Sequence, residues 1–166
     1  ISPEYPVDNI PTPDRINLGR HLYFDLRLSR DRSMSCATCH SPTKGWADSS
    51  PRAVGFAKTE LGRHSPTVLN TAFNTAQFWD GRAATLEAQA VGPIMAAGEM
   101  NMPSEEEVIN TIRNAPEYKS LFQAAYGVEP SMETIGKAIA AFERTIVSGP
   151  SRFDDYVGGN KSALNE

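Results

Sequence analysis

The run Cys36-Ala37-Thr38-Cys39-His40 organises the interpretation of this chain. Two thiols at this spacing can form thioethers with the vinyl groups of a haem, and the adjacent histidine can turn its imidazole onto the iron. Both cysteines of the sequence lie in this run, so no disulfide framework competes and no second pair exists for a zinc site. The polar flanks are not typical of the strand-to-helix junction of a thioredoxin-like redox motif. The sequence therefore predicts one covalently bound haem c, attached through Cys36 and Cys39, with His40 as the metal ligand.

Length and charge restrict the class of protein. A chain of 166 residues is long enough for one domain with a real core and too short for two well-formed ones. The net charge of −4 argues against a general nucleic-acid binder, because phosphate binding needs a concentrated basic face. No apolar run approaches the roughly 18 residues that a membrane span needs. Since covalent haem attachment occurs outside the cytoplasm, we expect a periplasmic chain whose export signal has been removed.

The C-terminal third carries the clearest helix signals. Ser104 and the glutamates after it predict a helix start, and Pro116 ends that helix and begins the next. Gly127 is the expected stop of the second helix. Ser131 opens a third and longer helix that Gly149-Pro150 closes. Apolar residues at three- and four-residue spacing along these helices predict a packed bundle.

The rest of the chain predicts a mostly α fold. Thr12-Pro13 is the expected start of a short first helix, and 83–91 is a good helix former that Gly92-Pro93 interrupts. We find no convincing strand. The predicted architecture is a cytochrome c-like haem domain with long loops around the haem.

The longest loop is predicted after the haem motif. Residues 41–67 are rich in Pro, Gly and Ser and show neither helical nor strand periodicity. Loops of this length in compact domains are usually functional. We expect this one to wrap the edge of the haem, with Trp46 and Phe56 as apolar contacts.

The group at the sixth iron position would decide the function. Met95, Met100 and Met102 are candidates for the second axial ligand of an electron-transfer cytochrome c, and they are equally suited to filling a core. Gln89 and Glu99 favour a peroxidase instead. A carboxylate near the haem can move a proton between the two oxygens of hydrogen peroxide, and an amide can orient the peroxide. Spacing alone leaves both readings open, beside a haem-based sensor.

Several further blocks of sequence add a family resemblance. The chain resembles the bacterial di-haem cytochrome c peroxidase family, which includes the MauG-type maturation enzymes, and the match covers nearly its whole length. The blocks that carry the resemblance are LGRHLYFD at 18–25, SCATCH at 35–40, SPTVLN at 65–70, QFWDGRA at 77–83, QAVGP at 89–93 and the Glu-Met pair at 99–100.

The resemblance implies roles for individual residues. The motif at 36–40 would hold the family's N-terminal, peroxidatic haem. Glu99 matches its distal acid–base glutamate, Gln89 its distal glutamine and Trp79 the tryptophan between the two haems. The implied reaction is reduction of hydrogen peroxide to water. Electrons would come from a second haem domain of the same enzyme, or from a c-type cytochrome or cupredoxin, and a homodimer is possible within the family.

The chain departs from the family pattern in its domain content. Members normally carry a second Cys-x-x-Cys-His motif in a C-terminal domain, and this sequence has none. We therefore expect 1–150 to form the peroxidatic haem domain and 151–166 to be the linker toward a second haem domain.

Two substitutions in the long loop are also informative. Many members place a displaceable distal histidine ten residues before the proline matching Pro66, and here that residue is Phe56. A phenyl ring has no lone pair for iron, which predicts an open sixth position. His64 stands where members often have an asparagine that helps to hold calcium. Because histidine is a poorer calcium ligand than an oxygen donor, the sequence does not predict calcium binding by this chain alone.

Overall fold

The structure, a computed structural model, describes residues 3–164, and within that range it is helical with only isolated β-bridges. This confirms the predicted mostly α fold. The α-helices are α1 Pro13–Phe24, α2 Cys36–Cys39, α3 Leu86–Met95, α4 Glu105–Arg113, α5 Pro116–Tyr126, α6 Met132–Glu143 and α7 Arg152–Val157. Short 3-10 turns are η1 Leu26–Leu28, η2 Pro42–Lys44, η3 Phe56–Lys58 and η4 Thr71–Phe73.

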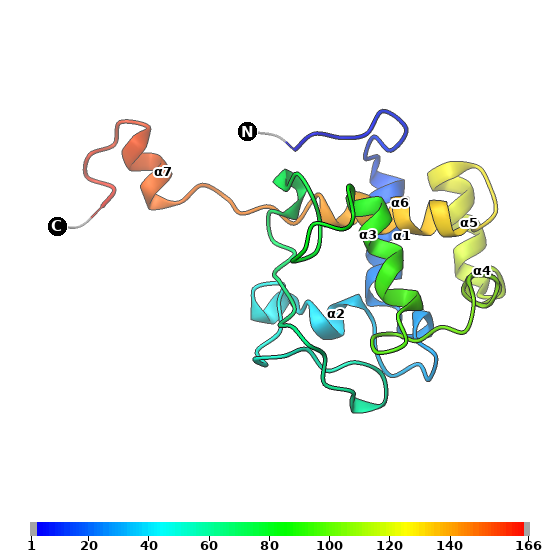
Figure 1. The fold of residues 1–166 in the computed structure, drawn as a ribbon. Coiled ribbons are helices and arrows are strands. Elements are labelled where there is room, and N and C mark those ends of the chain that lie inside the picture. The colour runs from blue at the N-terminus through cyan, green and yellow to red at the C-terminus, as the bar shows by residue number, and fades with distance from the viewer. Residues whose placement is uncertain (1–2, 165–166) are drawn as a thin grey trace.

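The crossing of α1 and α6 forms the centre of the molecule, with α3 on one side of α6 and α5 beside α1 (Figure 1). At the crossing the two backbones are almost in contact. A Cβ added to Gly19 would lie 1.8 Å from the carbonyl oxygen of Ala138. A glycine is therefore required on α1, and its absence of a side chain sets the distance between the two helices.

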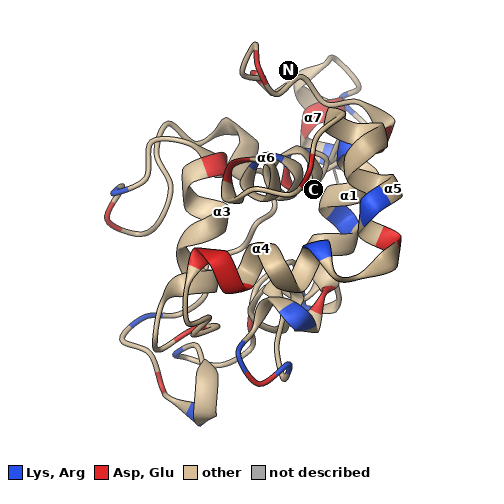
Figure 2. Cartoon of the chain, turned by 90° about the vertical axis from the view of Figure 1, so that its right-hand side faces the viewer, with Lys and Arg blue, Asp and Glu red and all other residues tan. Residues whose placement is uncertain are grey.

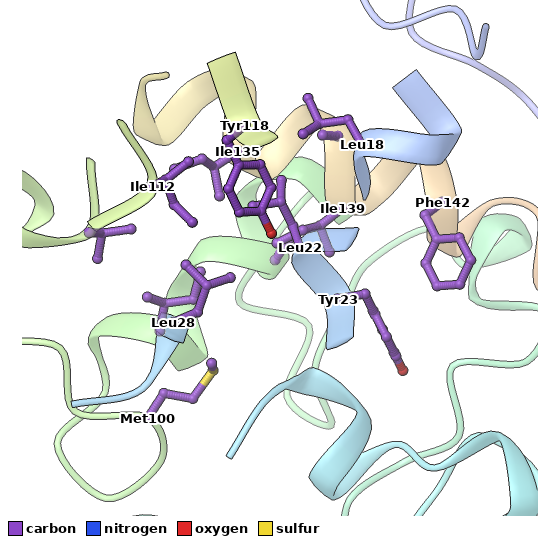
Figure 3. Close-up of a cluster of buried hydrophobic side chains, with 14 of the residues drawn as sticks. Leu18, Leu22, Tyr23, Leu28, Met100, Ile112, Tyr118, Ile135, Ile139 and Phe142 are labelled. Carbon is purple, nitrogen blue, oxygen red and sulfur yellow. The ribbon is translucent and has the colours of Figure 1, made fainter. Parts of the chain in front are cut away.

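The core surrounds this crossing and draws on α1, η1, α3, α4, α5 and α6 (Figure 3). All its labelled residues are almost fully buried, and burying a single Leu or Ile contributes about 1.5–3 kcal/mol. They are Leu18, Leu22, Tyr23, Leu28, Met100, Ile112, Tyr118, Ile135, Ile139 and Phe142.

Most helix ends lie where side-chain signals predicted them. The Thr12 hydroxyl accepts the backbone N–H of Arg15 at the start of α1, and Ser104 accepts that of Glu107 at the start of α4. Gly127 ends α5 in the left-handed conformation, with φ of 68°. These caps satisfy backbone groups that a helix leaves without partners.

The C-terminal ends of two helices were predicted wrongly, and α3 begins at Leu86 and not at residue 83. α3 is not interrupted by Gly92-Pro93 but continues to Met95. The ring of Pro93 falls in the last turn, where the missing N–H costs one hydrogen bond, while the next residue, Ile94, is fully buried. α6 ends at Glu143, well before Gly149-Pro150. The hydroxyl and the N–H of Thr145 both donate to the Phe142 carbonyl, which closes the helix, and residues 145–147 are all β-branched.

The segments outside the helical body also differ in kind. Residues 41–67 form the predicted long loop, with two 3-10 turns and two isolated bridges. The Ile146 carbonyl and the Ser148 N–H still bond to Asn70, and after them the chain runs away from the body to α7 (Figure 1). The predicted boundary at residue 150 stays a prediction.

Charged residues are mixed in sign over the helices and loops visible in Figure 2, with an acidic first turn on α4. Within residues 3–164 no helix combines the length and apolarity that crossing a membrane requires.

The α1–α6 contact gives the first testable prediction. Gly19→Ala should lower the free energy of unfolding by about 1–3 kcal/mol, because backbone atoms must move apart to admit the methyl group. Urea unfolding followed by circular dichroism measures the effect. Gly62→Ala is the matched control, since a Cβ there meets nothing within 4 Å. Equal unfolding midpoints for the two variants would contradict this account of the crossing.

Candidate functional site

A cavity of about 390 Å³ opens between the helical body and the long loop. Its volume falls within the range of about 300–1,000 Å³ typical of small-molecule and cofactor sites. Most of its wall comes from five parts of the chain: α2 with the residue after it, the loop at 61–68, the segment 77–82, α3 with the loop after it, and α6. Its lining includes Cys36, Cys39, His40, His64, Pro66, Trp79, Arg82, Gln89, Glu99, Met100, Ile139 and Glu143.

The short helix α2 delivers both thiols to this cavity. The Ser35 N–H donates to the Thr38 hydroxyl at 2.9 Å, which fixes the first turn of the helix. Cys36 and Cys39 stand three residues apart on α2 and are not joined to each other. Both thiols are thus available at the wall of one cavity.

His40 follows directly and is held by two hydrogen bonds. Its Nδ1 lies 2.9 Å from the Pro66 carbonyl oxygen, which can only accept, so Nδ1 carries the proton and Nε2 keeps its lone pair. The Tyr23 hydroxyl donates to the His40 carbonyl at 3.0 Å. Burial lowers the pKa of the imidazole, which favours its neutral form. A neutral histidine oriented through its other nitrogen is the usual arrangement of a metal ligand.

Gln89 and Glu99 line the same cavity, from α3 and from the loop after it. Burial raises the pKa of the Glu99 carboxyl, and the charge of Arg82 acts in the opposite direction. The Arg82 guanidinium itself lies over the Phe78 ring, 3.4 Å from the ring centroid. Arg82 was not predicted from the sequence as a site residue.

The backbone around Glu99 is tied to the long loop. The Phe56 N–H donates to the Glu99 carbonyl at 2.7 Å. A Cβ on Gly55 would lie 1.9 Å from the carbonyl oxygen of Gly98, so the two loops approach as closely as a glycine permits. This contact holds the loop that presents the carboxyl to the cavity.

Trp46 and Phe56 were predicted as haem contacts, and the structure places neither in the cavity wall. Trp46 packs edge-on against Tyr23 and Phe142, with ring centroids 5.9 and 6.1 Å away, and lines a separate open groove. Phe56 meets the site only through its backbone bond to Glu99. The sequence alone does not show which way an aromatic ring points when its residue lies in a loop beside a haem motif.

Trp79 and His64 lie together at the cavity wall. Trp79 is 62% exposed, and its indole N–H donates to the His64 carbonyl at 2.9 Å. The His64 ring donates through Nδ1 to the Ser50 carbonyl at 2.8 Å.

Among the three methionines considered as axial ligands, Met100 lines the cavity, whereas Met95 and Met102 do not.

Glu143 is the one cavity residue with an unpaired buried carboxylate oxygen. It projects from α6, is 5% exposed, and its Oε2 has no hydrogen-bond partner. Sequence reasoning missed it, although a signal was present: it falls on the apolar stripe of α6 four residues after Ile139. Acidic side chains are rarely fully buried unless they are paired. A glutamate at a position that the helical period predicts to be buried is therefore a candidate site residue.

These residues fit a covalently bound haem. Two free thiols and a neutral, oriented histidine lie at one wall of a cavity of cofactor size. The lining is otherwise mostly apolar, with a few polar groups from other elements, as haem sites require.

The chain matches the family model described as di-haem cytochrome c peroxidase over residues 13–162. It is 48% identical over 162 residues to the methylamine utilization protein MauG of Methylorubrum extorquens, which covers 96% of this chain and 46% of that protein. It is 44% identical over 151 residues to the cytochrome c551 peroxidase of Pseudomonas aeruginosa, covering 89% of this chain and 43% of that one.

A solved structure agrees over the whole chain. The crystal structure of a MauG-like protein associated with microbial copper homeostasis superposes with a TM-score of 0.91 at 30% identity, covering 100% of this chain and 49% of that one. The chain therefore spans about half the length of the relatives it matches.

The motif on α2 gives the second testable prediction. After expression with a c-type haem maturation system, the denatured chain should keep the mass of one haem, and replacing Cys36 and Cys39 together with alanine should abolish this. Mass spectrometry and a pyridine haemochrome spectrum measure it. Ser41→Ala, just outside the motif, should keep its haem. Haem that extracts from the unmodified chain into acidified organic solvent would refute the assignment.

Proposed function

Since the chain belongs to the di-haem cytochrome c peroxidase family, we propose that it is a haem peroxidase domain that reduces hydrogen peroxide to water. The family resemblance expected from the sequence is thereby confirmed. The observation that best supports the proposed activity is the common cavity, whose wall includes the haem motif together with Gln89 and Glu99.

In this proposal Cys36 and Cys39 hold the haem by thioether bonds and His40 binds its iron through Nε2. When bound, the haem would supply the iron at which the O–O bond of peroxide is cleaved, and it would pass on the electrons that it receives from a donor. The Pro66 carbonyl fixes the orientation of the His40 ring through the 2.9 Å hydrogen bond. A hydrogen bond of this kind also raises the basicity of the ligand.

Glu99 is the proposed acid–base residue. Its carboxylate accepts a proton from one oxygen of the peroxide and returns it to the other oxygen, which leaves as water. Burial raises the pKa of this carboxyl, and a pKa nearer to neutral pH makes it suitable for both halves of the transfer. The positive charge of Arg82 acts against this rise in the pKa.

Gln89 is proposed to orient the peroxide. Its side-chain amide has both a donor and an acceptor, so it can hydrogen-bond the substrate without exchanging a proton. It stands on α3, a helix packed against α6, and not on a mobile loop. A rigid element of this kind suits a positioning residue.

Each turnover needs two electrons and two protons. We propose that the electrons come from a second haem domain of the same enzyme, or from a c-type cytochrome or cupredoxin in the periplasm. Trp79 is the proposed contact toward the second haem, since its exposed ring forms part of the cavity wall. The predicted homodimer, and the absence of calcium binding by this chain alone, stay predictions.

A specific observation supports a second candidate. The Met100 thioether lines the cavity beside Glu99 and could occupy the sixth iron position. The chain would then be a mono-haem electron-transfer cytochrome c.

Replacement of the proposed acid–base residue is the third testable prediction. Glu99→Gln should slow the reaction of the ferric haem-loaded chain with hydrogen peroxide by about 10²-fold or more, because the amide cannot transfer the proton. Stopped-flow absorbance measures the rate. The resting visible spectrum should be nearly unchanged.

Two variants complete the comparison. Glu60→Gln makes the same chemical change on an exposed loop side chain, and it should leave the peroxide rate unaltered. Gln89→Ala should slow the reaction without changing its dependence on pH. An undiminished rate in the Glu99 variant would refute its role, and loss of the ferric spectrum would show that Glu99 is structural.

A further inference from the structure

Glu143 brings a second carboxyl into this site, and it lies on a different element from Glu99. Its side chain lies in the cavity wall at the C-terminal end of α6, one turn after Ile139, which lines the same cavity. Its Oε2 is buried without a hydrogen-bond partner. Burying a carboxyl without a partner is costly, so its retention in a cofactor cavity calls for a physical reason.

The surroundings of Glu143 only partly offset a negative charge on its carboxyl. The ionisable groups that face it are Tyr23 on α1, Cys36 on α2, Glu87 on α3 and the adjacent Arg144. Arg144 is already committed, because its guanidinium donates to both oxygens of Glu87 at 2.6 and 3.0 Å. Tyr23 is a buried neutral phenol, and Cys36 no longer ionises once it is a thioether.

The protonation state of Glu143 is therefore sensitive to any further charge in the cavity. Burial raises the pKa of its carboxyl to about 8, so without a cofactor in the cavity the carboxyl favours its neutral form at pH 7. A positive charge entering the same cavity would favour the ionised form, and little water is present to screen the interaction. A haem supplies such a charge, because its ferric form carries one positive charge more than its ferrous form.

We propose that Glu143 is a redox-linked proton site: it takes up one proton when the haem in this cavity gains one electron, and it releases that proton when the haem is oxidised. The electron and the proton arrive together, so the net charge of the buried site is unchanged by reduction. In the peroxidase cycle this would bring a proton into the site with the electron that peroxide reduction consumes. The inference rests on the haem of the proposed function and not on the reaction with peroxide.

The sign of the effect follows from the charge of the carboxylate. Ionised Glu143 stabilises the ferric state and so lowers the reduction potential, whereas neutral Glu143 does not. Below the pKa of the ferric state the carboxyl is neutral in both states and the potential is constant. Between the pKa values of the ferric and ferrous states, the equilibrium constant for reduction falls up to tenfold for each pH unit, which for one electron is about 59 mV.

The experiment is a potentiometric titration of the haem-loaded chain from pH 5 to pH 10. We expect the potential of the unmodified chain to fall with pH in a window below about pH 8. Glu143→Gln, which is nearly the same shape but cannot ionise, should lose this fall and show the higher potential at alkaline pH. Glu99→Gln, a change at another carboxyl of the same cavity, should keep the fall. Haem propionates are common to all three proteins.

Infrared difference spectra between the ferric and ferrous states give an independent readout. The unmodified chain should gain a protonated-carboxyl band on reduction, and the Glu143→Gln chain should not. If Glu143→Gln does not fold, Glu143→Met supplies a neutral side chain of similar length. The proposal is overturned if the potential of the Glu143 variant falls with pH as in the unmodified chain, if Glu99→Gln abolishes the fall, or if reduction of the unmodified chain gains no such band.

The outcomes also separate this inference from the proposed function. A haem-loaded chain that shows the Glu143-dependent fall but reacts with peroxide no faster than its Glu99→Gln variant would support the inference and refute the peroxidase role. A chain that carries no covalent haem in the pyridine haemochrome assay would overturn both.

Discussion

The close crossing of α1 and α6 is the constraint on which the site depends. Because Gly19 has no side chain, α1 lies almost in contact with the Ala138 carbonyl on α6. From this one contact α1 extends to Tyr23, whose hydroxyl supports the backbone of His40. α6 extends from the same contact to Glu143 in the cavity wall. The helix packing thereby fixes His40 and a buried acid relative to each other.

The loops complete the cavity by similarly close contacts. Gly55 lies against the Gly98 carbonyl, and the Phe56 N–H bonds to the carbonyl of Glu99. The long loop thus presents residues to the cavity on one side and holds the Glu99 loop on the other. A site assembled this way needs few ordered elements of its own, since the helices are rigid and the loops are tied to them.

Features that depend on neighbouring residues in the sequence were predicted correctly, whereas features that depend on tertiary packing were missed. Helix ends marked by a cap, such as Thr12 and Gly127, were predicted correctly because the signal lies within one turn. The passage of α3 through Pro93 was not, since burial of the next residue compensates for a lost backbone bond. In the site, the haem motif was evident from two cysteines and a histidine. Glu143 escaped notice because its burial depends on how α6 faces the cavity.

The proposed peroxidase function requires a sixth iron position that is open to peroxide. Electron paramagnetic resonance of the resting ferric, haem-loaded chain at neutral pH tests this most directly. Because the Phe56 ring lies outside the cavity wall and has no lone pair, we expect an axial high-spin signal, with water at most as a weak ligand. A purely low-spin ferric signal would contradict it, by showing that a side chain such as Met100 or His64 occupies the iron and that the chain is an electron carrier.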